Sequence, residues 1–364
     1  MESFSNSYAQ ARSKFLAAAE HRGLAIQSVI HPLRGPDDEI LATDVVRLGV
    51  AAAKRTLYVT TGVHGVEGYY GSGVIVQWLR DGWVPPADIK VILVHACNPH
   101  GFAWGRRFTE ENVDLNRNFW SLDQVPEPNA AYAEIQHLVE YSGVGADSIE
   151  HCQQQLAEYL QKNGAANFKI ALSGGQPQSS QGLFFTGTEP TWARHTYEQL
   201  VRQHTQGSDH VFYMDLHTGL GPRGYADFLH QYATGSTELN HLVSYIGERV
   251  LGDERDEATA QGLEGTTISC FSRHAKELGY SLLGGAIECG TTPLDRTLEA
   301  LLQETALHRH GCDDDQLAAQ IRQQLKDVFY VNEDDWKQQV FEQTCDIRQG
   351  AINYLTDLQP EAKP

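Results

Sequence analysis

Three features that would indicate other classes of protein are missing from this sequence of 364 residues. There is no run of about 18 consecutive apolar residues, so a membrane-spanning helix is not expected. The first residues also lack the basic-then-apolar pattern of a secretory signal. The six cysteines contain no Cys-x-x-Cys pair, which argues against a structural zinc knuckle and favours reduced, mostly buried thiols. We therefore expect a soluble, cytoplasmic protein.

Positive charge is also scarce. The chain has 28 Lys and Arg against 47 Asp and Glu, a formal net charge of -19. This balance argues against nucleic acid or an anionic membrane surface as a partner, because both are bound through Lys and Arg. With 41% hydrophobic and 21% charged residues, the chain can bury a large core. No internal repeat or low-complexity linker divides it. We predict a single domain over residues 1–364, with helical C-terminal additions at about 296–364.

The order of apolar segments predicts the fold class. Residues 55–61 contain the apolar run 57–59 and residues 88–96 are nearly continuous in apolar character, so both are predicted as strands. Residues 69–81 between them have apolar side chains at helical spacing. Strand, helix and strand in this order imply a right-handed crossover and a parallel pair. Further strands are predicted at 24–33, 43–50, 210–217, 225–232 and 280–289. The pattern predicts an α/β protein, a three-layer sandwich around a mixed, mostly parallel twisted sheet.

Polar residues with metal-binding side chains follow three of these strands. His64 and Glu67 follow the first, and His217 and Glu288 lie at the ends of two later ones. Carboxyl ends of parallel strands meet at one edge of a sheet, where open α/β sheets place their active sites. Two imidazoles and one carboxylate suit a single catalytic Zn²⁺ with an open coordination position, so we predict His64, Glu67 and His217 as ligands. The alternative is that these two histidines, out of 16 in the chain, are ordinary surface or core residues.

Four segments in this order resemble the motifs of the zinc carboxypeptidase superfamily. They are TGVHGVEG at 61–68, VDLNRNF at 113–119, DLHTG at 215–219 and IECGT at 287–291. The Gly-x-His-Gly-x-Glu and Asp-Leu-His-Thr forms are most similar to the branch that includes aspartoacylase and succinylglutamate desuccinylase, and to related uncharacterised bacterial metallopeptidase-like proteins. The resemblance extends from about residue 55 to 295, and it implies a zinc-carboxypeptidase-like fold.

The resemblance also implies roles for the residues of the metal site. Zinc would bind His64, Glu67 and His217, and Glu288 would act as general base and later as general acid. This agrees with elementary chemistry, because zinc lowers the pKa of a bound water toward about 7 and a nearby carboxylate takes the proton. A carboxylate in a surface salt bridge is the alternative for Glu288.

Residues of the 97–119 segment are implied to bind substrate. Asp114 would orient the first histidine through its other ring nitrogen, although an Asx turn also explains an aspartate here. Asn116 and Arg117 match the pair that binds a substrate carboxylate, for which a planar guanidinium is suited. Arg107 is preferred over Arg106 as the group that stabilises the oxyanion. Solvated surface arginines are the alternative.

The function expected from these residues is that of a metallocarboxypeptidase-like exopeptidase, which hydrolyses an amide bond next to a carboxylate. Its substrate would be a small molecule or a short peptide with a free carboxylate. An N-acyl amino acid deacylase and a non-catalytic carboxylate-binding module are the alternatives. No substrate-capping tyrosine is found in a matching context, since neither Tyr225 nor Tyr280 has one. The loop at residues 174–185 has no firm counterpart in those enzymes and is a candidate pocket wall.

Overall fold

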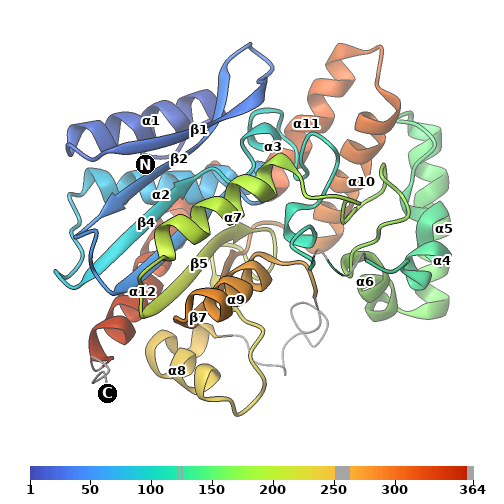
Figure 1. Ribbon diagram of the computed structural model, residues 1–364. Coiled ribbons are helices and arrows are strands. Elements are labelled where there is room, and N and C mark those ends of the chain that lie inside the picture. Colours follow the sequence, from blue (N-terminus) through green and yellow to red (C-terminus); the bar gives the residue numbers. More distant parts are fainter. Residues whose placement is uncertain (122, 124–125, 251–262, 359–364) are drawn as a thin grey trace.

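A seven-stranded mixed sheet runs through the centre of the molecule (Figure 1). The computed structural model describes residues 1–121, 123, 126–250 and 263–358. The strands follow the order β1 (Ile26–Arg34), β2 (Ile40–Leu48), β4 (Ile89–His95), β3 (Arg55–Thr61), β5 (His210–Thr218), β7 (Ser281–Cys289) and β6 (Ala226–Leu229). Strands β4, β3, β5 and β7 are parallel, whereas β1, β2 and β6 make antiparallel pairs. The predicted α/β class and mixed sheet are confirmed.

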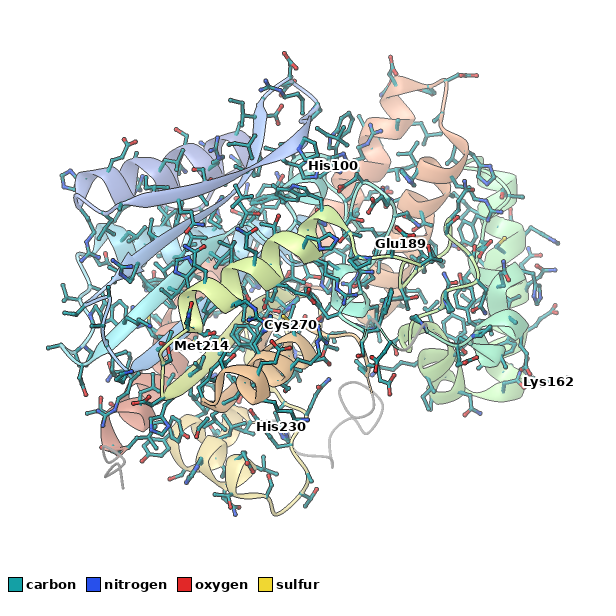
Figure 2. All side chains as sticks on the ribbon, viewed as in Figure 1. His100, Lys162, Glu189, Met214, His230 and Cys270 are labelled. Atoms are coloured by element: carbon teal, nitrogen blue, oxygen red, sulfur yellow. The ribbon has the colours of Figure 1, made fainter. Side chains whose placement is uncertain are left out.

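Helices cover both faces of the sheet and complete the predicted sandwich. One face carries α1 (Tyr8–His21), α2 (Gly68–Arg80) and α12 (Asp334–Asp357), and the other carries α7 (Trp192–Thr205) and α9 (Thr267–Leu278). Leu57 and Tyr58 of β3 belong to different cores, because successive strand side chains point to opposite faces. Met214 of β5 belongs to the first core and Cys270 of α9 to the second. Both side chains are labelled in Figure 2. Helix α8 (Thr237–Ile246) packs on α12.

A separate lobe of helices lies beside the sheet. It contains α4 (Ala130–Val139), α5 (Ala146–Asn163), α6 (Ala165–Ser173), α10 (Leu294–His310) and α11 (Asp315–Phe329). Tyr132, Phe168, Leu301 and Phe329 are among the buried side chains that form its core. Helix α10 begins shortly after the carboxyl end of β7. The lobe therefore borders the edge of the sheet at which the predicted metal site lies.

Three helices were not predicted, and one of them, α3 (Pro99–Ala103), has only five residues. Helix α6 has nine residues between Gly164 and Gly174, too short to show a clear period. Helix α9 buries Thr267, Cys270 and His274 together with one aromatic residue, so its buried face is not conspicuously apolar. The C-terminal helical region is also interrupted between α11 and α12.

The C-terminal helices contribute to the main core. Trp336 of α12 is fully buried, and its indole Nε1 donates to the Gly290 carbonyl at 2.9 Å. Among the described residues, no helix has both the length and the apolar character needed to cross a membrane. All six cysteines are free thiols and four of them are buried, as predicted.

Candidate metal centre

The turn after β3 requires glycine at two positions. Gly62 has a φ of +65°, in the left-handed region that residues with a Cβ adopt at a cost, and a Cβ there would lie 2.9 Å from Ala96. A Cβ on Gly65 would lie only 2.1 Å from the carbonyl carbon of Gly101, in helix α3 (Pro99–Ala103). The backbone can therefore reverse sharply and pack against α3. This reversal directs His64 and Glu67 back across the end of the sheet.

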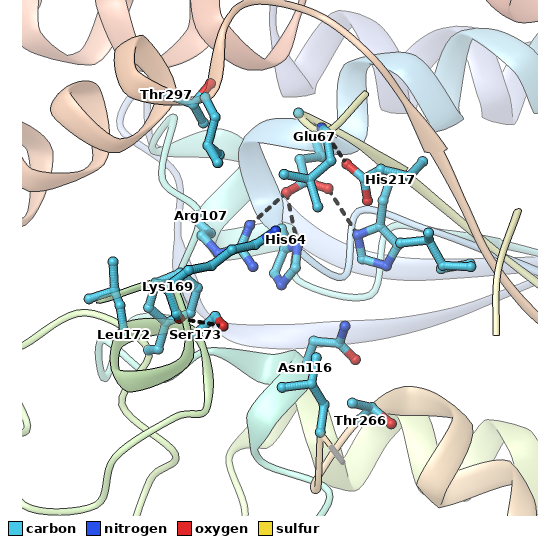
Figure 3. Close-up of a pocket in the computed structure, with 18 of the residues that line it drawn as sticks. His64, Glu67, Arg107, Asn116, Lys169, Leu172, Ser173, His217, Thr266 and Thr297 are labelled. Atoms are coloured by element: carbon cyan, nitrogen blue, oxygen red, sulfur yellow. Dashed lines mark hydrogen bonds and ion pairs between the residues drawn. The ribbon is translucent and has the colours of Figure 1, made fainter. Parts of the chain in front are cut away.

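His64, Glu67 and His217 converge at this edge (Figure 3). All three are buried, and their candidate ligand atoms lie within 4.8 Å of one another. His64 Nδ1 lies 2.9 Å from Glu67 Oε1, and His217 Nδ1 lies 2.9 Å from Glu67 Oε2. Strands β3 and β5 are parallel neighbours in register, which explains how residues 150 positions apart meet. Within the described ranges, no other group of His, Cys, Asp and Glu meets the same geometric criterion.

The orientation of His64 fits a shared cation. Its Nδ1 is buried and makes no hydrogen bond, although Glu67 Oε1 is only 2.9 Å away. These two atoms are therefore close without pointing at each other, as two ligands of one ion are. The other ring nitrogen, Nε2, lies 3.1 Å from Asp114 Oδ1, which leaves Nδ1 for the metal. A set of two imidazole nitrogens and one carboxylate is the type that binds Zn²⁺ at catalytic sites.

The contacts of Asp114 fit both of the roles predicted for it. Its Oδ1 lies near His64 Nε2 and also accepts the Asn116 backbone N–H at 2.9 Å, as in an Asx turn. Its Oδ2 lies 3.3 Å from Arg107 Nε. Burial alone raises the pKa of Asp114, but the charges of Arg107 and His64 outweigh it and leave that pKa well below its usual range. The carboxylate thus stays ionised.

Asp215 plays the corresponding part for the second histidine, and the sequence reasoning missed it. Its Oδ2 lies 2.8 Å from His217 Nε2. Thr60 and Thr267 donate their hydroxyl groups to the two carboxylate oxygens at 2.7 and 2.9 Å. The available signal was the Asp-x-His spacing, because residues two apart on a strand share a face.

We expect Asp215→Asn to lower zinc affinity by about 10- to 100-fold, the usual effect of losing a carboxylate behind a ligating histidine. Asparagine keeps the shape but removes the charge, and its single side-chain oxygen can accept from only one of Thr60 and Thr267. Competition with a chromophoric chelator measures the affinity. Asp209→Asn, an exposed site at the start of β5, is the matched control. Equal affinities for both variants would refute the role of Asp215.

The two neighbouring arginines have different environments. Arg107 lines the cavity at the metal site, where its NH1 lies 2.9 Å from Glu67 Oε1. Arg106 points away, and its Nε pairs at 2.6 Å with Glu304 Oε1 of α10. The backbone carbonyls of Arg106 and Arg107 accept the N–H groups of Val66 and of its preceding residue at 2.8 and 3.1 Å. Arg106 therefore anchors the segment that holds Arg107 beside the turn that carries His64 and Glu67.

We expect Arg106→Ala to destabilise the fold by about 3 to 5 kcal/mol, because it leaves the carboxylate of Glu304 buried and unpaired. Urea unfolding monitored by circular dichroism measures this loss. Arg322→Ala, at an exposed position on α11, is the control and should change stability by less than about 0.5 kcal/mol. Similar stabilities for the two variants would show that the Arg106–Glu304 pair contributes little.

Asn116 and Arg117 both line the cavity. The side-chain oxygen of Asn116 accepts the Thr267 N–H at 2.9 Å, and Figure 3 shows the side chain pointing into the cavity toward the histidines. Arg117 donates from Nε to the Ser173 carbonyl at 2.9 Å and from NH1 to the Asn116 carbonyl at 2.8 Å. These bonds fix the plane of the guanidinium group at the cavity wall.

Glu288 borders the same cavity. It is paired in register with His217 in the β5–β7 ladder, so the two side chains come from adjacent points of the sheet edge. Its Oε1 accepts the Leu220 N–H at 3.0 Å. Burial and then the negative charge of Glu67 raise the pKa of Glu288 to about 8. A carboxyl group with a pKa near neutrality is suited to proton transfer.

The cavity has a volume of about 610 Å³, within the usual range for small-molecule sites. Helices α6 and α10 supply one of its walls, which is mainly apolar: Phe168, Leu172, Leu298 and Leu301. Lys169 of α6 also lines it, and Figure 3 shows its side chain reaching toward Arg107. The sequence reasoning missed this wall because it missed α6. Tyr213 is the one tyrosine among the described residues that line the cavity, and neither Tyr225 nor Tyr280 lines it.

The sheet, its helical layers and the position of the His-Glu-His group define an α/β protein with a metallocarboxypeptidase-like fold. The chain belongs to the family described as Protein of unknown function (DUF2817), which matches residues 4–343. Its fold is similar to that of the carboxypeptidase A from Helicoverpa armigera, with a TM-score of 0.50, 11% identity and coverage of 96% of this chain and 74% of that one. The fold implied by the sequence motifs is thereby confirmed.

Two other solved structures are similar at lower scores. A metallo-carboxypeptidase from Pseudomonas aeruginosa has a TM-score of 0.40 and 11% identity, with 93% of this chain and 70% of that chain covered. A succinylglutamate desuccinylase/aspartoacylase from Rhodobacter sphaeroides has a TM-score of 0.38 and 15% identity, with 79% and 65% covered. No curated protein matches the chain significantly.

Proposed function

We propose that this protein is a zinc-dependent hydrolase that cleaves an amide bond next to a carboxylate, as an exopeptidase of the carboxypeptidase type. The observation that supports this best is the convergence of His64, Glu67 and His217 beside Glu288 at one edge of a cavity. The proposed substrate is a short peptide or small molecule with a free carboxylate. The formal charge of -19 makes nucleic acid an unsuitable partner.

The residues of the cavity suit the steps of such a reaction. Zinc, when bound, supplies a Lewis acid that polarises a carbonyl and acidifies water. Asn116 and Arg117 bind the substrate carboxylate and so place the amide bond at the metal site. Glu288 takes a proton from the attacking water and returns it to the amine nitrogen as the carbon–nitrogen bond breaks. The products are a carboxylic acid and an amine, and the carboxyl group of Glu288 ends unchanged.

Arg107 is assigned to the developing negative charge on the carbonyl oxygen. It lines the cavity, and its contacts to Glu67 and Asp114 fix its guanidinium group next to the ligands. Arg106 is unsuited to this role because it is committed to Glu304.

The second candidate function is the deacylation of an N-acyl amino acid. The position of the two candidate capping tyrosines favours it. Tyr280 is buried and donates to the Phe271 carbonyl at 3.3 Å, and Tyr225 lies with its ring 5.2 Å from the guanidinium carbon of Arg249. Neither contributes to the lining of the described cavity. A peptidase that depends on such a tyrosine would need one there.

Substrate profiling of the zinc-loaded protein tests both candidates. The values of kcat/KM for dipeptides and for N-acyl amino acids are compared, and each substrate has a control in which the terminal carboxylate is an amide. We expect activity on one class and a loss of about 10-fold or more for the amide controls, because a charged hydrogen bond contributes about 1.5 to 3 kcal/mol. Absence of turnover on both classes would leave the non-catalytic binding module as the better account.

A further inference from the structure

The loop at residues 174–187 contains a strained aromatic residue that faces the cavity. Phe184 has a φ of +53°, in the left-handed region that is unusual for a bulky side chain. Its side chain lines the cavity beside Arg107 and Arg117. Residues are held in this region only where the surrounding structure enforces it, and such residues cluster at functional sites.

Hydrogen bonds hold this loop firmly in place. Gln176 is fully buried, and its amide nitrogen donates to the carbonyls of Ser179 and Leu183 at 2.8 and 3.1 Å. The Asp114 N–H donates to the Phe185 carbonyl at 2.8 Å. The loop is therefore bonded to the same segment that carries the carboxylate behind His64. Phe184, between Leu183 and Phe185, cannot relax to an ordinary φ without breaking these bonds.

The ring of Phe184 contacts both arginines of the cavity. The guanidinium carbon of Arg107 lies 5.3 Å from the ring centroid, and that of Arg117 lies 5.8 Å from it. Both distances are within the range of a cation–π interaction. Phe108 supports the ring from behind, in an edge-on contact at 6.3 Å. One aromatic ring thus contacts two like charges. Burial lowers the pKa of Arg117, the charge of Asp114 opposes this shift, and repulsion from Arg107 adds to it.

We propose that Phe184 is a positioning residue that holds Arg107 and Arg117 in their working orientations, so that Arg117 receives the substrate carboxylate while Arg107 stays beside the metal site. The edges of both guanidinium groups are engaged by neighbouring oxygens: Glu67 and Asp114 for Arg107, and the Ser173 and Asn116 carbonyls for Arg117. The ring contacts the two guanidinium groups without occupying any of their N–H donors, so N–H groups remain to bind a ligand. This assignment rests on the proposed carboxylate specificity, and it adds a residue from a loop with no counterpart in the family motifs.

Ligand binding tests this role without requiring turnover. Isothermal titration of zinc-loaded protein compares 3-phenylpropanoate with 3-phenylpropan-1-ol, which has the same body and no charge. We expect Phe184→Leu to weaken binding of the acid by about 10-fold and of the alcohol by less than about 2-fold, since cation–π contacts contribute about 0.5 to 2 kcal/mol. Phe184→Tyr keeps the ring and should remain within about 3-fold of the parent for both.

The Arg117→Ala background shows whether Phe184 acts through the arginines. If it does, Phe184→Leu should weaken acid binding by a smaller factor there than in the parent protein. An equal factor in both backgrounds, or equal weakening of acid and alcohol, would overturn the proposal and leave Phe184 as a packing residue. A parent protein that does not prefer the acid would overturn it too. If the acid is preferred as expected but no amide is hydrolysed, the proposed hydrolase activity fails while the role of Phe184 stands.

Discussion

Replacing Glu288 with glutamine is expected to lower kcat by about 10²- to 10⁴-fold while leaving one zinc ion per chain. The substitution removes only the ability to take a proton, because glutamine has nearly the same size and its side-chain oxygen can still accept the Leu220 N–H. Glu288 is not among the three converging ligand residues, so metal content should not change. A variant with normal zinc and little activity is therefore the expected result.

The measurement combines steady-state kinetics with elemental analysis of the same preparation. Glu189→Gln, an exposed position on the loop before α7, is the matched control and should keep full activity. A kcat for Glu288→Gln within about 3-fold of the parent would remove Glu288 from the mechanism, since a general base contributes at least about 10². Loss of zinc together with activity would instead indicate a role in metal binding.

The convergence of His64, Glu67 and His217 could be predicted because it follows from the sheet. His64 and His217 follow apolar runs that become adjacent parallel strands, β3 and β5, and parallel strands present their carboxyl ends at one edge. The apolar runs alone located His64, His217 and Glu288 at strand ends, and the spacing from His64 located Glu67. This part of the site depends on strand order and direction, which hydrophobic patterns predict well.

The walls of the cavity could not be predicted in the same way. The apolar wall from α6 depends on how the helical lobe packs against the sheet, and α6 itself is short and flanked by glycines. The backbone conformation of Phe184 depends on hydrogen bonds made by Gln176 and Asp114, which no local pattern shows. The choice between Arg106 and Arg107 likewise depended on a distant partner, Glu304, on α10.

The C-terminal region shows the same limit. Residues 296–364 were predicted as helical additions, and this region contains α10, α11 and α12, the last of which ends at Asp357. Residues 359–364 lie outside the described residues. Their contribution to the site was not apparent from the sequence. Leu301 of α10 and Phe329 of α11 line the cavity, and the Phe329 carbonyl accepts the hydroxyl group of Thr218, next to His217. These helices therefore shape the cavity as well as covering the sheet.

His217→Ala is expected to abolish stoichiometric zinc binding. The alanine variant leaves only His64 and Glu67 as ligands, and Glu67 remains fixed by Arg107 and by the Thr218 N–H at 3.1 Å. The rest of the site therefore keeps its arrangement, so the loss reports on the missing ligand. We expect affinity to fall by more than the roughly 10- to 100-fold that follows loss of a group behind a ligand.

Elemental analysis and thermal unfolding with and without zinc measure this loss. Zinc at about 100 times its Kd stabilises the parent by about 2.7 kcal/mol, whereas His217→Ala should gain almost nothing at the same concentration. His195→Ala, an exposed histidine on α7, controls for the loss of an imidazole from the surface. One zinc per chain in His217→Ala would contradict the ligand set, and with it the inference that β3 and β5 bring two histidines to a common ion.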